Sequence, residues 1–253
     1  MRKVLGIVVA AALALVVVSA ATGITNGVRD GNAHPNVGAF LVHTSSGWQV
    51  VCTGSLVAPR VFLTASHCTS FTDSTGLQVG VTFQSTDAEH PASVALGHTV
   101  TNPLYKPPYG HDVSIIVLDA AQPGPYVPLP EVGLLDRMKK DGTLQTSDFV
   151  NVGYGTHEAV NGPGGKTFEF DGDRWTSVSS YSSLNQDMIH LHQKNNAGEG
   201  GTGYGDSGGP TLLNGVAVAV VSTGDVPLWS TSVNTRTDTQ EVADFLRPYL
   251  ALR

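Results

Sequence analysis

Short runs of β-branched and aromatic residues alternate with turn residues along most of the chain, from about residue 36 onward. Gly, Pro, Asn and Asp separate these runs, and no internal repeat is visible. Strands at this spacing predict an all-β sandwich or barrel. The runs that support the prediction are 39–42, 48–51, 61–64, 113–118, 149–154, 175–178 and 216–221.

A helical pattern stands only at the C-terminus. Asp238 and Glu241 resemble a capping box, and Pro248 limits how far the helix can run. The apolar positions that would form its buried face follow at helical spacing: Val242, Phe245, Leu246 and Tyr249. The sequence therefore predicts a helix within residues 238–253 that packs on the body of the fold.

A Pro-rich segment, residues 122–130, interrupts the strand pattern near the middle of the chain. Such a segment is typical of a linker between two β-units of similar size. We therefore expect an N-terminal unit over residues 24–130 and a C-terminal unit over residues 131–237.

The first 23 residues have the plan of a secretory signal peptide. Arg2 and Lys3 form a basic start, residues 4–18 are apolar, and small residues follow. Cleavage fits after residue 20 or 21, or after Gly23. The alternative is an uncleaved anchor, because the apolar stretch nearly reaches the ~20 residues that a membrane span needs. We expect a secreted protein with no stable membrane association after cleavage.

Composition and charge narrow the function classes. Charged residues make up 14% of the 253 residues, too few for a coiled coil, and the 41% hydrophobic share argues against a disordered chain. The formal net charge of −7 argues against nucleic acid as a partner.

Two cysteines, Cys52 and Cys68, are the only ones in the sequence. In an oxidising compartment they can form one disulfide, which would stabilise the fold by about 3 kcal/mol. The alternative is a pair of free buried thiols.

The densest chemical signal is the segment 205–210, Gly-Asp-Ser-Gly-Gly-Pro. Glycines on both sides of Ser207 permit a tight turn that exposes its hydroxyl and brings N–H groups together. A hydroxyl becomes a good nucleophile when a base takes its proton, and that base needs an orienting carboxylate.

Chain order restricts where the base and the acid can lie. All nine His precede Ser207, which excludes the order Ser, acid, His of the α/β-hydrolases. An acid before the base is also disfavoured, because Asp30 is the only acidic residue ahead of His67 and has no strand-like run around it. The order His, Asp, Ser remains.

His67 is the best candidate for the base, because it follows the apolar run 61–63 and stands next to Cys68. A disulfide at that position would fix the imidazole, as general-base chemistry requires. Asp112 is the best candidate for the acid, because it precedes the strongly apolar run 113–118. A carboxylate buried there would need a partner, and the imidazole of His67 would be one.

Residues 52–56, 63–68, 112–118 and 205–210 resemble the trypsin/chymotrypsin serine proteases, and the resemblance extends over about residues 24–250. It implies two six-stranded antiparallel β-barrels with the active site between them. It also implies a secreted serine endopeptidase of the bacterial type with a single disulfide, whose triad is His67, Asp112 and Ser207. The N–H groups of Gly205 and Ser207 would form the oxyanion hole.

The resemblance further implies an activation ion pair. Residues 24–27 look like the family's mature N-terminus, so the free ammonium of Ile24 would pair with Asp206. Position 23 is Gly where a trypsin-like activation site has Arg or Lys. We therefore expect signal peptidase to cut after Gly23 and release an active enzyme. The alternative is a short propeptide that another protease removes.

The resemblance also identifies the residues of the specificity pocket. Gly201 stands where trypsin-like members carry an Asp that selects Lys or Arg, and Ser222 and Gly224 match the segment that lines the pocket. Gly203 stands where the family usually has a pocket-lining Cys. We expect a neutral P1 residue, meaning the residue on the acyl side of the scissile bond.

Neither a metal nor another cofactor is expected. His190 and His192 could lie on one strand face, and Asp171 and Asp173 could bind calcium, but no complete ligand set is evident. The expected partner is a polypeptide substrate, and we expect a monomer. A catalytically silent homologue that serves as a binding module is the alternative function, and an esterase would use the same triad.

Overall fold

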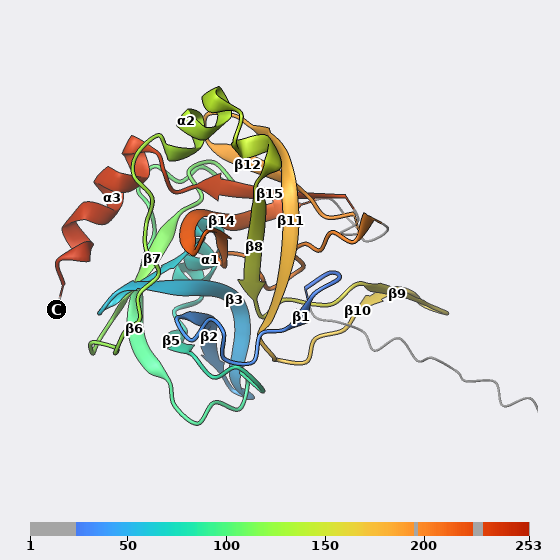
Figure 1. Ribbon diagram of the computed structural model, residues 1–253. Helices are drawn as coiled ribbons and strands as arrows, with labels where there is room; N and C mark the ends of the chain where they lie inside the picture. Colours follow the sequence, from blue (N-terminus) through green and yellow to red (C-terminus); the bar gives the residue numbers. More distant parts are fainter. Residues whose placement is uncertain (1–23, 195–196, 225–229, 253) are drawn as a thin grey trace, which may run out of the picture.

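The computed structural model of the chain describes residues 24–194, 197–224 and 230–252, so the predicted signal segment lies outside the described residues. Figure 1 shows two β-barrels packed side by side with helices at their edges. Within the described ranges, no helix has the length and apolar character needed to cross a membrane.

The first barrel is closed and antiparallel. Its interior is filled by large apolar side chains such as Phe40, Phe62 and Ile116, all fully buried. These come from the β-branched and aromatic runs of the sequence, which place alternate side chains inside. In spatial order its strands are β2 (Val37–Thr44), β3 (Gly47–Ala58), β4 (Val61–Thr64), β7 (Ser114–Leu118), β6 (Ala95–Val100) and β5 (Gln78–Thr82).

The second barrel also closes with six strands, because β8 (Asp148–Gly153) pairs with β11 (Trp175–Leu184) on one side and with β13 (Pro210–Leu213) on the other. A short strand, β1 (Val28–Arg29), adds to its edge, and the hairpin β9 (Ala159–Gly162) and β10 (Gly165–Phe168) projects from it (Figure 1). The closed strands are β8 (Asp148–Gly153), β11 (Trp175–Leu184), β12 (Met188–His192), β15 (Thr231–Arg236), β14 (Val216–Gly224) and β13 (Pro210–Leu213). The prediction of two six-stranded barrels is confirmed.

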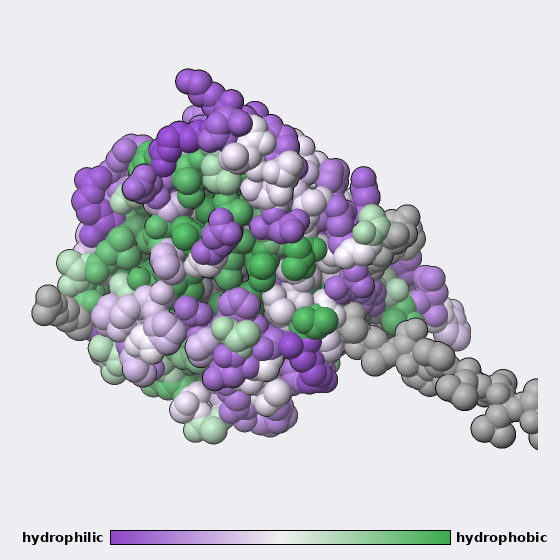
Figure 2. Space-filling model, in the orientation of Figure 1, coloured by the Kyte–Doolittle hydropathy of each residue, from purple (hydrophilic) through white to green (hydrophobic). Residues whose placement is uncertain are grey.

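The expectation that helical structure is confined to the C-terminus is wrong. The described chain also contains α1 (Ser66–Thr75), α2 (Leu134–Asp141) and a 3₁₀ turn, η1 (Leu144–Thr146). Helix α1 has no amphipathic pattern that could predict it. Its threonine hydroxyls instead donate hydrogen bonds to carbonyls three residues earlier. Helix α2 is short, and polar residues cover it at the top of Figure 2.

One disulfide joins Cys52 in β3 to Cys68 in α1, as predicted, and no cysteine remains free. Helix α1 contains a run of Ser and Thr with no apolar stripe, so its own sequence stabilises it little. The disulfide therefore anchors the start of α1 to the wall of the first barrel.

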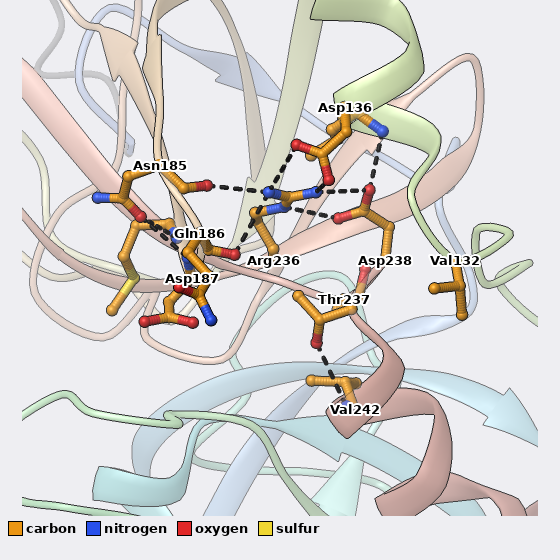
Figure 3. Close-up of polar contacts among 12 residues, drawn as sticks. Val132, Asp136, Asn185, Gln186, Asp187, Arg236, Thr237, Asp238 and Val242 are labelled. Carbon is orange, nitrogen blue, oxygen red and sulfur yellow. Dashed lines mark hydrogen bonds and ion pairs between the residues drawn. The ribbon is translucent and has the colours of Figure 1, made fainter.

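The C-terminal helix α3 (Gln240–Leu250) is present, but its start differs from the prediction. The N-cap is Thr239, whose hydroxyl accepts from the Val242 N–H, and the capping box of Asp238 and Glu241 does not form. Asp238 instead accepts hydrogen bonds from buried Arg236 (Figure 3).

Arg236 fixes the strand end that precedes α3. Its guanidinium also binds Asp136 of α2 and the carbonyls of Asn185 and Gln186 (Figure 3). A buried charge is stable only when its donors are satisfied, and here Asp238 is the partner that satisfies Nε. The predicted capping box does not form because the Asp238 carboxylate accepts hydrogen bonds from Arg236 instead.

A second buried cation, Arg174, lies between the barrels at the start of β11. It is fully buried, and its Nε donates to Asp30 at 2.8 Å. Its remaining hydrogen bonds reach Gly31, Val37, Phe83 and the Tyr154 hydroxyl. Burial alone would raise the pKa of Asp30, but hydrogen bonds from His34 and Arg174 lower it to about 2.

The variant Asp30→Asn would leave Arg174 buried without its counter-charge. We expect its free energy of unfolding at pH 7 to fall by about 3–5 kcal/mol, measured by urea denaturation. The matched control is Asp87→Asn, because the Asp87 side chain is 65% exposed. It should change stability by less than about 0.5 kcal/mol.

The same pair predicts a pH dependence. The folded-state pKa of Asp30 lies below its ordinary value of 3.8, so its contribution is complete above about pH 5 and is lost as pH falls toward 2. The stability difference between wild type and Asp30→Asn should therefore shrink by about 2 kcal/mol over that range. A difference that stays constant with pH would contradict this assignment.

Candidate active site

Two of the predicted catalytic residues, His67 and Ser207, line one cavity between the barrels, and the third, Asp112, is buried behind His67. The cavity has a volume of about 260 Å³ and is lined by His67 and Tyr109 from the first barrel and by Ser207 and residues 202–205 and 221–224 from the second half of the chain. A larger hollow of about 610 Å³ surrounds Arg236 and contains none of the predicted catalytic residues.

Asp112 holds His67 through two hydrogen bonds. One carboxylate oxygen accepts from the backbone N–H of His67 at 2.8 Å, and the other lies 2.8 Å from the ring Nδ1. Asp112 is fully buried, so its charge depends on these donors. With the proton on Nδ1, the neutral ring keeps Nε2 as a free acceptor.

Ser222 supplies a third donor to the same carboxylate. Its hydroxyl donates to Asp112 at 2.6 Å, and its residue also lines the cavity. The sequence predicts Ser222 only as a specificity-pocket residue and gives no sign of this bond. No local pattern could have revealed it, because 110 positions separate the two residues.

Local structure fixes both members of the pair. His67 is the second residue of α1, directly before the disulfide-bonded Cys68. Asp112 follows His111, whose φ of 54° turns the chain just before β7 begins. The Ser66 hydroxyl donates to the His111 carbonyl, so the two segments are also joined directly.

Ser207 lies in a turn that the first barrel contacts. Its carbonyl accepts from the Thr53 N–H at 2.9 Å, while the Gly208 N–H donates to Val221. Gly208 has a φ of 81°, and an added Cβ would lie 2.1 Å from the Thr64 hydroxyl and 2.5 Å from the Thr53 carbonyl. Glycine is therefore required at position 208 by both conformation and space.

The N–H groups of Gly205 and Ser207 are available to a ligand. Both residues line the cavity, and within the described residues neither amide donates to a protein acceptor. The side chain between them, Asp206, is fully buried and accepts from the N–H groups of Gly155 and Gly203. Burial raises the pKa of Asp206 to about 7.

Asp206 has no ion pair among the described residues. Ile24 is fully buried, and Thr25 bridges to Gly201, but residue 24 is joined to residue 23 by a peptide bond here. The predicted ammonium at Ile24 does not exist before cleavage, so the pair with Asp206 stays a prediction.

Comparison with known proteins agrees with this geometry. A sequence model of the family described as trypsin matches residues 24–245. The chain belongs to the trypsin family. It is accordingly a serine-type endopeptidase, a hydrolase.

A solved structure of a protein named HL collagenase superposes with a TM-score of 0.67. The match covers 91% of this chain and 100% of that one at 16% identity, so the likeness concerns the fold. No curated protein matches the chain.

The pocket residues of this trypsin-family chain lie partly where they were expected. Ser222 and Gly224 line the cavity, but Gly201 does not. A Cβ on Gly201 would lie 2.0 Å from the amide oxygen of buried Gln193, so this position packs behind the wall. Thr202, which is not among the residues predicted from the sequence, lines the cavity instead.

No carboxylate or ammonium lines the described part of the cavity. Glu199, the nearest acidic residue in sequence to the Gly201 position, bonds to the Ser180 hydroxyl and the Lys194 N–H. The described wall is therefore formed by neutral residues and by the imidazole of His67.

The positions considered for metals are engaged otherwise or incomplete. Asp171 and Asp173 form ion pairs with Arg29. His190 and His192 lie in β12, and no third ligand group joins them within the described ranges.

The variant Gly208→Ala should prevent the serine turn from forming, because both strain and a clash oppose the methyl group. We expect a loss of at least about 3 kcal/mol in unfolding free energy. The matched control is Gly215→Ala, since Gly215 has a similar φ of 79° and open space around it. That variant should lose only about 1 kcal/mol. Equal losses in denaturant titrations would show that conformation alone matters.

Proposed function

We propose that the protein is a secreted serine endopeptidase that uses His67, Asp112 and Ser207 as its catalytic triad. The N–H groups of Gly205 and Ser207 form its oxyanion hole. The observation that supports this most is the buried Asp112 carboxylate. It bonds to the backbone N–H and the ring Nδ1 of His67, which leaves Nε2 as the other ring nitrogen, and His67 lines the same cavity as Ser207.

The reaction proceeds through an acyl-enzyme. His67 Nε2 takes the proton of the Ser207 hydroxyl as its oxygen bonds to the substrate carbonyl carbon. The amides of Gly205 and Ser207 stabilise the negative oxygen, and losing one such donor typically costs about 10²–10³ in turnover. The C–N bond then breaks, and His67 gives its proton to the leaving amine. Water repeats the two steps and releases the acid.

The electrostatics favour a neutral P1 side chain. A Lys or Arg side chain would need a carboxylate where it ends, and the described cavity wall contains none. Position 201, where an Asp would select a basic residue, is filled against Gln193. Peptide libraries with one variable P1 position measure this preference directly.

A fluorophosphonate probe tests the triad, because it reacts only with an activated serine. Intact-mass analysis should show one adduct on the wild-type chain and none on Ser207→Ala. The variant Asp112→Asn should lower peptide turnover by about 10⁴-fold, because His67 loses the correct tautomer. Ser45→Ala, a change at an exposed serine, is the control and should be labelled like wild type.

An unlabelled wild-type chain that starts at Ile24 would overturn the proposal and favour a binding module. An adduct that persists in Ser207→Ala would place the nucleophile elsewhere. An unlabelled chain that carries extra N-terminal residues would show instead that the chain begins as a precursor.

We also propose that cleavage after Gly23 completes the site. In the uncleaved chain Asp206 is buried among neutral groups. Burial disfavours its charged form and raises its pKa to about 7. The ammonium of Ile24 would supply a cation and lower that pKa. A stable Asp206 carboxylate would then hold the Gly205 and Ser207 amides in place.

This proposal gives a measurable pH dependence. In the uncleaved chain the folded pKa of Asp206 lies above its ordinary value of 3.8, so stability falls as pH rises from about 4 to 7, by up to about 4 kcal/mol. A chain that starts at Ile24 should lack this fall. Urea denaturation in the Ser207→Ala background avoids self-digestion, and a chain that starts at Ala21 serves as the uncleaved form. Equal pH slopes in the two chains would contradict the ion pair.

A further inference from the structure

The hairpin β9–β10 is bonded at its base to both sides of Gly205. The Thr156 N–H donates to the Tyr204 carbonyl at 2.7 Å, and the Gly155 N–H donates to the Asp206 carboxylate at 2.8 Å. Gly155 and Thr156 lead directly into the hairpin, whose base is closed by the bond from the His157 N–H to the Glu169 carbonyl. The hairpin therefore connects to the residues before and after Gly205.

The bond to Tyr204 fixes the direction of an oxyanion-hole N–H. The Tyr204 carbonyl and the Gly205 N–H belong to one planar trans peptide unit, so they point in opposite directions. When Thr156 holds the carbonyl, the Gly205 N–H is directed away from Thr156. Gly205 has a φ of 101°, a conformation that glycine leaves easily, so this peptide needs an external restraint.

An aromatic contact from the hairpin also restrains Tyr204, the residue before Gly205. The ring of Phe168, at the end of β10, meets the ring of Tyr204 edge-on, with centroids 5.1 Å apart and an interplanar angle of 90°. Phe168 pairs with Ala159 in the hairpin ladder, which places its ring beside the base. Tyr204 lines the catalytic cavity and is 48% exposed, so Phe168 is the ring that restrains it.

We propose that Phe168 is a positioning residue for peptide hydrolysis. It holds Tyr204, and through the Tyr204–Gly205 peptide it keeps the Gly205 N–H directed at the oxyanion. This inference rests on the proposed triad and oxyanion hole. It adds one side chain, Phe168, which lies about 40 residues before Ser207 in the sequence, to the groups that stabilise the transition state.

The variant Phe168→Ala tests the proposal. We expect kcat to fall by about three- to tenfold, the factor that corresponds to the full contribution of an edge-to-face aromatic pair to the transition state. KM should change less than about twofold, since the oxyanion forms only in the transition state. The rate of fluorophosphonate labelling should fall in parallel. Phe168→Tyr, which keeps the ring, should restore all three values.

Two further variants separate positioning from folding. Val160→Ala changes an exposed residue of the same hairpin and should leave kcat, KM and thermal stability unchanged. The kcat loss in Phe168→Ala combined with Tyr204→Ala should not exceed that of Tyr204→Ala alone, because both changes remove one contact.

A wild-type kcat in Phe168→Ala, or losses that add in the double variant, would overturn the role of Phe168 and leave the triad intact. A rise in KM with unchanged kcat would also overturn it, because Phe168 would then shape substrate binding only. A wild-type chain that starts at Ile24 and neither hydrolyses peptides nor accepts the probe would overturn the proposed function together with this inference.

Discussion

The buried guanidinium of Arg174 is the constraint on which the positions of the other elements depend. A cation with no exposure must have its donors filled, and here the acceptors come from the N-terminal segment, the first barrel and Tyr154. Tyr154 directly precedes Gly155 and Thr156, whose amides hold the turn around Gly205. The cation that joins the two barrels is thus also connected, through Tyr154, to the loop that holds the turn around Gly205.

The proposed catalytic groups come from both halves of the molecule, and short-range contacts join these halves. The first barrel provides Asp112 and His67, and the second provides Ser207 and Ser222. The hydroxyl of Ser222 reaches across to the Asp112 carboxylate, and the Thr53 N–H reaches back to the Ser207 carbonyl. Alignment therefore does not depend on the buried apolar surface alone, which is non-directional.

The strand runs predicted an all-β sandwich or barrel, and the resemblance of the motifs to the trypsin/chymotrypsin proteases narrowed this to two six-stranded barrels. The motifs also indicated His67 and Ser207, which line one cavity. Strand patterns are local, and a glycine-flanked serine with a preceding His and Asp leaves few arrangements open. The same reasoning missed α1, whose Ser- and Thr-rich sequence owes its helix to a disulfide and local hydroxyl bonds. It also missed the Ser222–Asp112 bond and misread Asp238, because their partners are set by tertiary contacts.

The two ends of the chain cross over to the opposite barrels. Strand β1 and Thr25 pair with β11 and Gly201 of the second barrel, while Val242 and Leu246 of α3 pack on Val113 and Ile115 of the first. Each half of the chain thus contributes a terminal segment that packs on the barrel of the other half. The predicted boundary at residue 130 therefore does not separate two independently stable units, and the two barrels should unfold together in one cooperative transition. A fragment that ends at that boundary would lack α3, the helix that covers the apolar surface around Val113 and Ile115.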